Sequence, residues 1–142
     1  MSDDASNAAI ITRQKVADDQ RINMTADLFG VYFPLRLEPF VYGITSKLSD
    51  DYSGGYWHFY TLSNGGFYMA PDGYSHYQVY SENGFEDFMS ADALGITACL
   101  YAYSHLSFGE DEFSAICANQ YHLLREFMLA HAEAKSILGA ID

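Results

Sequence analysis

Histidine and cysteine side chains are the residues of this 142-residue sequence best suited to bind a metal or attack a substrate. The two cysteines, Cys99 and Cys117, fall in apolar, helix-like stretches without a CxxC pair, so we expect two reduced, buried thiols. None of the five histidines makes an HExxH motif or another compact ligand pattern. They are His58, His76, His105, His122 and His131. The spacing therefore predicts neither a metal site nor a cofactor site, with a site of scattered His and Asp side chains as the alternative.

Glycine pairs and paired carboxylates are the other motifs with a chemical interpretation. Gly54-Gly55 is not followed by the helix that a phosphate loop requires, and Gly65-Gly66 fits a hairpin turn better. Asp50-Asp51 forms no catalytic pair, because adjacent side chains on a helix do not point together. We therefore predict that the protein is not an enzyme. The alternative is a hydrolase or metal-dependent nuclease with a pocket that unites His58, His76 and a carboxylate.

The charge balance of the chain is strongly acidic. Seven Lys and Arg residues stand against 19 Asp and Glu, for a formal net charge of -12. Phosphate backbones repel such a chain, so we expect no direct nucleic-acid binding. The charge favours either a basic surface on a protein partner or simple solubility. Since no signal-peptide core and no segment of membrane-spanning length is present, we expect a cytoplasmic protein without membrane contact.

The elements that would position these groups indicate an α+β fold. Hydrophobic residues make up 49% of the chain, enough for a core, and we predict a single domain over residues 1–142 with a flexible N-terminus at residues 1–9. Ser90 caps a largely buried helix that runs to about His105, in which Gly95 allows close approach of the sheet. With these, about four to five helices are predicted. Of the other predicted helices, the first has Thr25 as its N-cap, and the second begins near Pro39 and ends near Asp50-Asp51. A third follows the acidic residues 110–112, and the last runs from about Glu133 to Leu138.

An aromatic hairpin forms the centre of the predicted small antiparallel sheet. Two aromatic-rich strands flank Asn64-Gly65, which can adopt the positive φ angles of a type I′ turn. With this two-residue loop, Leu62 faces Phe67 and Tyr60 faces Met69. Both faces of the hairpin are apolar, so we expect one face under helices and the other partly covered or exposed. Residues 77–81 alternate and would add a third strand.

The hairpin also carries a family resemblance. Residues 52–71, YSGGYWHFYTLSNGGFYMAP, resemble the signature of the ArdB/KlcA family of antirestriction proteins. Residues 90–107, SADALGITACLYAYSHLS, are similar to the buried helix of that family, and residues 121–142, YHLLREFMLAHAEAKSILGAID, to its C-terminal helix and closing Ala-Ile-Asp. The resemblance implies a compact α+β fold, and it does not imply a catalytic site. It also implies relief of type I restriction in a bacterial host, which protects the incoming DNA of mobile elements.

Two mechanisms are consistent with such an activity. In the first, the protein binds the type I restriction-modification complex or a host factor on which that complex depends, and the aromatic hairpin and acidic surface form the interface. The candidate contacts are Trp57, Tyr60, Tyr68 and Asp142. In the second, carboxylates imitate the phosphates of DNA and occupy a DNA-binding groove. The acids disfavour mimicry because they occur in short clusters rather than along an extended face. The clusters are at residues 3–4, 18–19, 50–51, 86–87 and 110–112.

Overall fold

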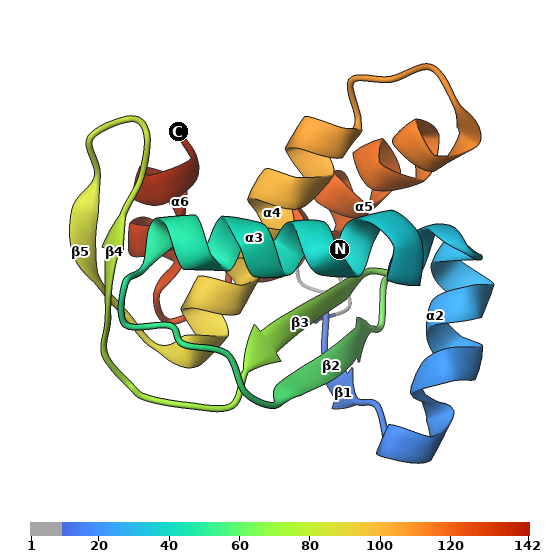
Figure 1. The fold of residues 1–142 in the computed structure, drawn as a ribbon, viewed down its shortest axis with the longest axis horizontal. Coiled ribbons are helices and arrows are strands. Elements are labelled where there is room, and N and C mark those ends of the chain that lie inside the picture. Colours follow the sequence, from blue (N-terminus) through green and yellow to red (C-terminus); the bar gives the residue numbers. More distant parts are fainter. Residues whose placement is uncertain (1–9) are drawn as a thin grey trace, which may run out of the picture.

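The computed structural model describes residues 10–142, and the flexible N-terminus predicted for residues 1–9 lies outside them. The described chain is α+β, as predicted, with five α-helices around two small antiparallel sheets (Figure 1). Its elements are β1 (Arg13–Lys15), η1 (Asp18–Gln20), α2 (Arg21–Phe29), η2 (Phe33–Leu37), α3 (Glu38–Leu48), β2 (Trp57–Leu62), β3 (Phe67–Pro71), β4 (Tyr77–Tyr80), β5 (Glu86–Met89), α4 (Ala91–Leu106), α5 (Glu112–Met128) and α6 (Ala134–Ile141). None of the helices between residues 10 and 142 has the length and apolar character needed to cross a bilayer.

The larger sheet recruits its third strand from the start of the chain. Its order is β1-β2-β3, with Arg13 opposite Leu62 and Lys15 opposite Tyr60. Residues 77–80 do form a strand, but the prediction that it joins the hairpin is wrong, because β4 pairs with β5 in a separate two-stranded sheet. The third strand of this sheet is thus the N-terminal segment Arg13–Lys15, which pairs with β2.

The register of the central hairpin differs by one residue from the prediction. Tyr60 pairs with Tyr68, not with Met69. The loop has three residues rather than two, since the amide of Gly65 donates to the carbonyl of Leu62 at 2.9 Å and Gly65 has a φ of 95°. A turn followed by a left-handed glycine is the common form of three-residue hairpin loops. The shift places Tyr60 and Tyr68 side by side on one face of the sheet.

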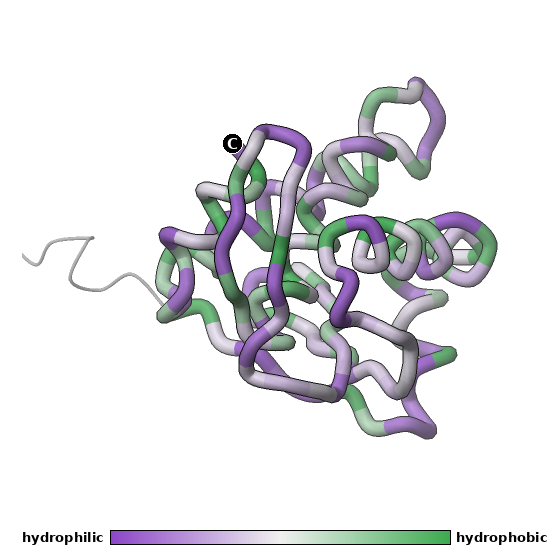
Figure 2. The backbone as a smooth tube through the Cα atoms, turned by 60° about the vertical axis from the view of Figure 1, so that its left-hand side comes forward, coloured by the Kyte–Doolittle hydropathy of each residue, from purple (hydrophilic) through white to green (hydrophobic). Residues whose placement is uncertain are grey.

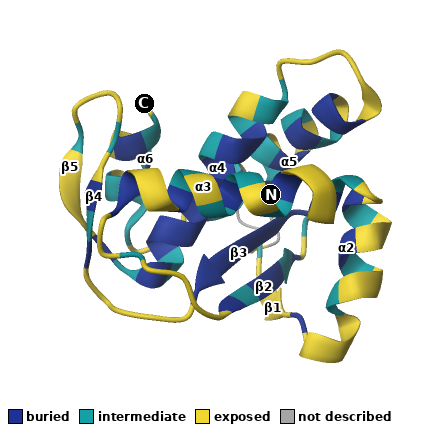
Figure 3. Cartoon of the chain, in the orientation of Figure 1, coloured by how far each residue is buried: buried dark blue, intermediate teal, exposed yellow. Residues whose placement is uncertain are grey.

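Helix α4 covers the free edge of β3 and is the most deeply buried helix (Figure 3). The hydroxyl of Tyr103 donates to the carbonyl of Phe67 at 2.8 Å, and the thiol of Cys99 lies 3.6 Å from the carbonyl of Met69. Side chains of α4 therefore satisfy backbone groups that an exposed edge strand would offer to another chain. Gly95 allows this approach, as predicted, because a Cβ there would lie 2.5 Å from the Cα of Ala70.

Aromatic side chains from the helices cover both faces of the hairpin. Phe33 of η2 packs edge-to-face on Phe59 and Phe67, with ring centroids 5.6 and 5.8 Å apart. On the opposite face, Phe127 of α5 stacks on Tyr68 at 5.8 Å. This packing removes the aromatic rings on both faces of the hairpin from water. The hairpin is therefore the middle layer of the core.

The helix starts follow local capping chemistry where a cap is present. Ser90 caps α4, as predicted, by accepting a hydrogen bond from the amide of Ala93 at 3.1 Å, and Asp111 caps α5 in the same way. The prediction that Thr25 caps a helix is wrong. Helix α2 begins four residues earlier at Arg21, and the Thr25 hydroxyl donates to the Arg21 carbonyl at 2.8 Å inside the helix.

The tip of the β4–β5 hairpin lies beside the C-terminal helix. It is largely hydrophilic and stands next to the C-terminus in Figure 2. The side-chain amide of Asn83 donates to the carbonyl of Gly139 in α6 at 2.9 Å. The second sheet therefore holds α6 against the domain, and with it the end of the chain.

Candidate partner-contact site

Three of the four predicted contact residues lie in the core. The exposed fractions of Trp57, Tyr60 and Tyr68 are 3%, 8% and 0%. Trp57 donates its indole N–H to the hydroxyl of Tyr52 at 3.0 Å, and Tyr60 stacks on Tyr68 with centroids 4.9 Å apart. The expectation that the hairpin exposes these rings is wrong, since helices cover both faces. In this fold they have almost no surface to offer a partner.

Asp142 differs from these three because it is exposed at the end of the chain. Its backbone amide donates to the carbonyl of Leu138 at 3.0 Å, which continues the last turn of α6. Its side-chain carboxylate places a negative charge at this point of the surface. Asp142 stays a prediction as a partner contact.

A charged network links the start of α4 to distant segments of the chain. One carboxylate oxygen of Asp92 accepts hydrogen bonds from Arg13 at 2.7 Å and from the hydroxyl of Tyr68 at 2.8 Å. The other lies 2.8 Å from Nε2 of His131. Because these partners come from β1, β3 and the segment after α5, the Asp92 network ties both ends of the chain to the central helix.

The electrostatics of this network favour a charged Asp92. Burial alone would raise the pKa of the Asp92 carboxyl, but hydrogen bonds from His131 and Tyr68 and the charge of Arg13 hold it below its ordinary value. Burial and the neighbouring carboxylate raise the pKa of the Tyr68 hydroxyl far above its ordinary value. The tyrosine therefore acts only as a neutral hydrogen-bonding group at physiological pH.

The polar groups in and beside the Asp92 network are hydrogen-bonded to one another or to nearby backbone. Nδ1 of His131 accepts a hydrogen bond from the amide of Glu133 at 2.9 Å, so the other ring nitrogen carries the proton that faces Asp92. The Ser90 hydroxyl donates a hydrogen bond to the carboxylate of Glu133 and accepts one from the amide of Ala93 at the start of α4. Both groups therefore have hydrogen-bonding partners within the fold, and together they hold the start of α4 against the segment after α5.

The cysteines and the remaining histidines add no reactive cluster. Burial raises the pKa of both Cys99 and Cys117 to about 12, so both thiols are protonated and unreactive. His58 pairs with Asp72 at 3.0 Å and His76 contacts Ser75, so each histidine has its own neighbour. Within residues 10–142, no three His, Cys, Asp or Glu side chains are grouped so as to hold a metal ion.

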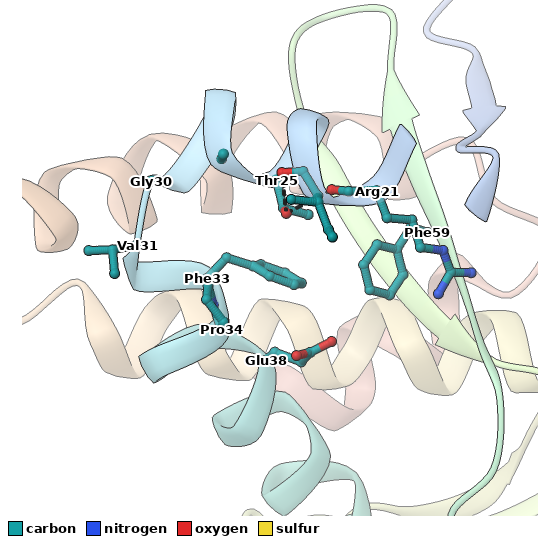
Figure 4. A pocket seen from close by; sticks show the side chains of 10 residues that line it. Arg21, Thr25, Gly30, Val31, Phe33, Pro34, Glu38 and Phe59 are labelled. Carbon is teal, nitrogen blue, oxygen red and sulfur yellow. Dashed lines mark hydrogen bonds between the residues drawn. The ribbon is translucent and has the colours of Figure 1, made fainter. Parts of the chain in front are cut away.

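An open groove lies between α2 and α3 on the described surface. We call it the α2–α3 groove; its volume is about 460 Å³. Arg21, Thr25 and Glu38 supply its polar groups. Figure 4 shows Val31 at one end and Arg21 with Phe59 at the other, while Glu38 lies on the α3 side. The apolar lining consists of Ile22, Ala26, Val31, Phe33, Pro34 and Phe59.

Large apolar side chains stand exposed around this groove. The lining residues Ile22 and Val31 are 83% and 62% exposed, and Leu35, next in sequence to the lining residue Pro34, is 68% exposed. An exposed apolar area next to a concave one is typical of a surface that binds another molecule. The α2–α3 groove and its rim are therefore the strongest candidate for a contact site in the described chain.

A protein-family match covers the C-terminal two thirds of the chain. The family model described as "Antirestriction protein" matches residues 50–142. The chain is also 41% identical over 136 residues to an antirestriction protein KlcA of Escherichia coli, which covers 93% of this chain and 95% of the relative. This chain belongs to the antirestriction protein family. The resemblance carried by the hairpin motif is thereby confirmed.

Other members of the antirestriction family match at similar levels. A second KlcA of Escherichia coli is 43% identical over 139 residues and covers 93% of this chain and 94% of the relative. A solved structure of the KlcA and ArdB proteins superimposes with a TM-score of 0.87 at 39% identity, over 94% of this chain and 96% of that chain. Those proteins are described as showing a novel fold and antirestriction activity against type I DNA restriction systems in vivo but not in vitro.

The sequence reasoning did not find the groove of this antirestriction protein. Its walls come from a helix that was predicted to start at Thr25, where the structure starts it at Arg21, and from a turn that carries no recognised motif. The available signals are Pro34 and two exposed apolar residues. Ile22 lies outside the buried stripe of α2, and Val31 follows the end of that helix. No sequence signal identifies Asp92 as the centre of a network, because its three partners lie far away in sequence.

Proposed function

We propose that this protein relieves type I restriction in a bacterial cell by binding a protein. The target is either the restriction-modification complex or a host factor on which the complex depends. One observation carries the proposal: the chain shares its fold and nearly its whole length with KlcA and ArdB, which act in vivo but not in vitro. An activity that appears only in cells is what a need for a further cellular component would produce. The cytoplasm, where restriction complexes meet incoming DNA, is the proposed place of action.

The chemistry of the described surface supports binding rather than catalysis. Nδ1 of His131 and the Ser90 hydroxyl are both engaged within the Asp92 network, and both thiols are buried. The α2–α3 groove presents apolar side chains with one carboxylate and one guanidinium, which suits recognition of another molecule. We therefore propose that the protein acts without a catalytic step and without a cofactor.

DNA mimicry receives less support from the positions of the acids. Several carboxylates in the predicted clusters have a structural partner. Asp18 bonds to Tyr56, Asp51 accepts from the amide of Gln78, and Asp111 caps α5. A mimic needs carboxylates arranged at the spacing of phosphates along an extended face. These acids stabilise helix ends and loops. The net charge of -12 would in addition attract a basic partner.

The test is phage plating with a matched biochemical assay. Unmodified phage is plated on cells with an active type I system, with and without expression of this protein. Modified phage and a host that lacks restriction are the controls. We expect the protein to raise plating of unmodified phage only on the restricting host. Equal plating with and without the soluble protein would contradict the proposed function.

The biochemical arm separates the two classes of target. The purified restriction enzyme cleaves unmodified DNA in the presence of a molar excess of this protein, with and without extract from a host that lacks restriction genes. Inhibition only with the extract favours a host factor, and inhibition without it favours the complex itself. Competition by added non-specific DNA would favour mimicry, because a mimic and DNA share one groove.

A further inference from the structure

The α2–α3 groove has the size and lining of a binding site. Its volume of about 460 Å³ lies within the range of roughly 300–1,000 Å³ that is typical of ligand sites. Phe33 and Phe59 contribute aromatic surface, and Ile22 and Val31 form an exposed apolar rim. A water-filled groove with these walls leaves apolar surface hydrated, which an apolar side chain of another molecule would relieve.

Charge around the groove favours a cationic group on the occupant. Glu38 lines the groove, and its carboxylate accepts one hydrogen bond from Tyr42 at 3.0 Å but takes part in no ion pair within residues 10–142. At the other end, the Arg21 guanidinium pairs with Asp18 at 3.5 Å, and one of its terminal nitrogens bonds to the Tyr56 hydroxyl and the Trp57 carbonyl, although its buried Nε makes no hydrogen bond. A lysine or arginine of the occupant would therefore meet Glu38 without competition, and the net charge of -12 would attract it from a distance.

The backbone beside the groove adds an independent observation. Residues Phe33–Leu37 form a π-helical turn, in which the amide of Glu38 bonds to the carbonyl of Phe33. Such turns are rare, and they occur frequently at functional sites. Here the turn buries Phe33, which lines the groove, and leaves Leu35 exposed next in sequence to the lining residue Pro34. A regular helix would rotate these side chains relative to one another, so the unusual turn shapes the groove wall.

We infer that the α2–α3 groove docks a segment of a protein partner that carries an apolar anchor residue next to a lysine or arginine. The anchor fills the space between Ile22, Phe33 and Phe59, and the basic side chain pairs with Glu38. This inference rests on the proposed function only in taking the partner to be a protein. A small molecule would favour a closed pocket, whereas this groove is open and flanked by exposed apolar side chains that a larger surface can cover.

A peptide selection tests the chemistry of the occupant directly. The probe is a phage-displayed library of random dodecapeptides, selected on the immobilised full chain. We expect the enriched peptides to share an apolar residue adjacent to Lys or Arg. Enrichment of acidic or uncharged peptides, or no enrichment above background, would overturn the inference.

Two variants locate the binding site of the selected peptides. Ala26→Phe fills the groove from α2 and should weaken binding at least about tenfold, because it removes the space for a buried apolar side chain. Glu38→Gln removes the charge but keeps the shape, and should weaken binding by about two- to fivefold, as expected for an exposed ion pair. Ala115→Phe is the matched control, since Ala115 is an exposed helical alanine outside the groove. Circular dichroism confirms that each variant is folded.

The outcomes separate this inference from the proposed function. Equal peptide binding by Ala26→Phe and the unchanged chain would overturn the groove assignment, whatever the phage-plating result. If the peptides bind as expected but the unchanged chain gives no restriction relief, then the groove is confirmed as a docking site and the proposed function fails. A bound small molecule that competes with the peptides and copurifies with the chain would also overturn the inference.

Discussion

Substitution of Gly95 by alanine probes the contact that organises the core. A Cβ at Gly95 would lie 2.5 Å from the Cα and Cβ of Ala70 and from the carbonyl oxygen of Met69. Two of these three atoms belong to the backbone of β3, so they cannot rotate away. Overpacking of this kind costs about 1–3 kcal/mol, and contact with backbone places this site near the upper end.

The intrinsic preference of alanine for helices opposes this cost. Alanine is favoured over glycine in a helix by about 1 kcal/mol. The difference predicts that Gly95→Ala lowers the free energy of unfolding by about 2 kcal/mol. For a chain of this length, the melting temperature should then fall by roughly 4–8 °C. Chemical unfolding followed by the fluorescence of the single, buried Trp57 measures the change.

A second glycine provides the matched control. Gly43 lies inside α3, and a Cβ added there would meet no atom within 4 Å. Gly43→Ala should therefore raise the free energy of unfolding by about 0.5–1 kcal/mol through propensity alone. If Gly95→Ala stabilised the protein as much as Gly43→Ala, then the close packing of α4 on β3 would be refuted.

Three further changes test the Asp92 network, the buried thiols and the α4 cap. Asp92→Asn should lower the free energy of unfolding at pH 7 by about 1–2 kcal/mol, measured by urea unfolding. The folded-state pKa of Asp92 is depressed, so its contribution to stability is present above the unfolded pKa of about 4 and is lost as the pH falls below it. The variant should therefore lose less stability on acidification than the unchanged chain. An equal loss would contradict the network. Because burial raises the pKa of Cys99 and Cys117 to about 12, neither thiol should react with a thiol reagent in the native state, while both should react in guanidinium; rapid native reaction would place a thiol at the surface. Ser90→Ala removes the N-cap of α4 and should cost about 1 kcal/mol in thermal unfolding, whereas an unchanged melting temperature would argue against the cap.

Features encoded by neighbouring residues were predictable from the sequence. Ser90 as the cap of α4, Pro39 in the first turn of α3 and the close approach at Gly95 each depend on the geometry of a single element. The aromatic strands and their glycine-containing loop were also found because their period differs from that of the helices. The family motif lies in this hairpin and is readable locally, whereas the burial of Trp57, Tyr60 and Tyr68 depends on segments elsewhere in the chain.

Features that depend on distant residues were not predictable. The loop Ser63-Asn64-Gly65 fits either a two-residue or a three-residue turn, and that single step decides whether Tyr60 faces Met69 or Tyr68. The third strand comes from Arg13–Lys15, a segment too short and polar to signal a strand. The groove and the Asp92 network exist only after α2, α3 and α4 are packed. Burial of both hairpin faces likewise follows from helices whose positions no local pattern specifies.

Phage plating on a restricting host tests the central claim most directly. The unchanged chain, Ala26→Phe and Ala115→Phe are expressed to equal soluble levels, and unmodified phage is plated on each strain. We expect the unchanged chain and Ala115→Phe to raise plating, and Ala26→Phe to leave it unchanged. Relief by the folded Ala26→Phe variant equal to that of the unchanged chain would contradict a contact through the α2–α3 groove. Absence of relief in all three strains would contradict the antirestriction function itself.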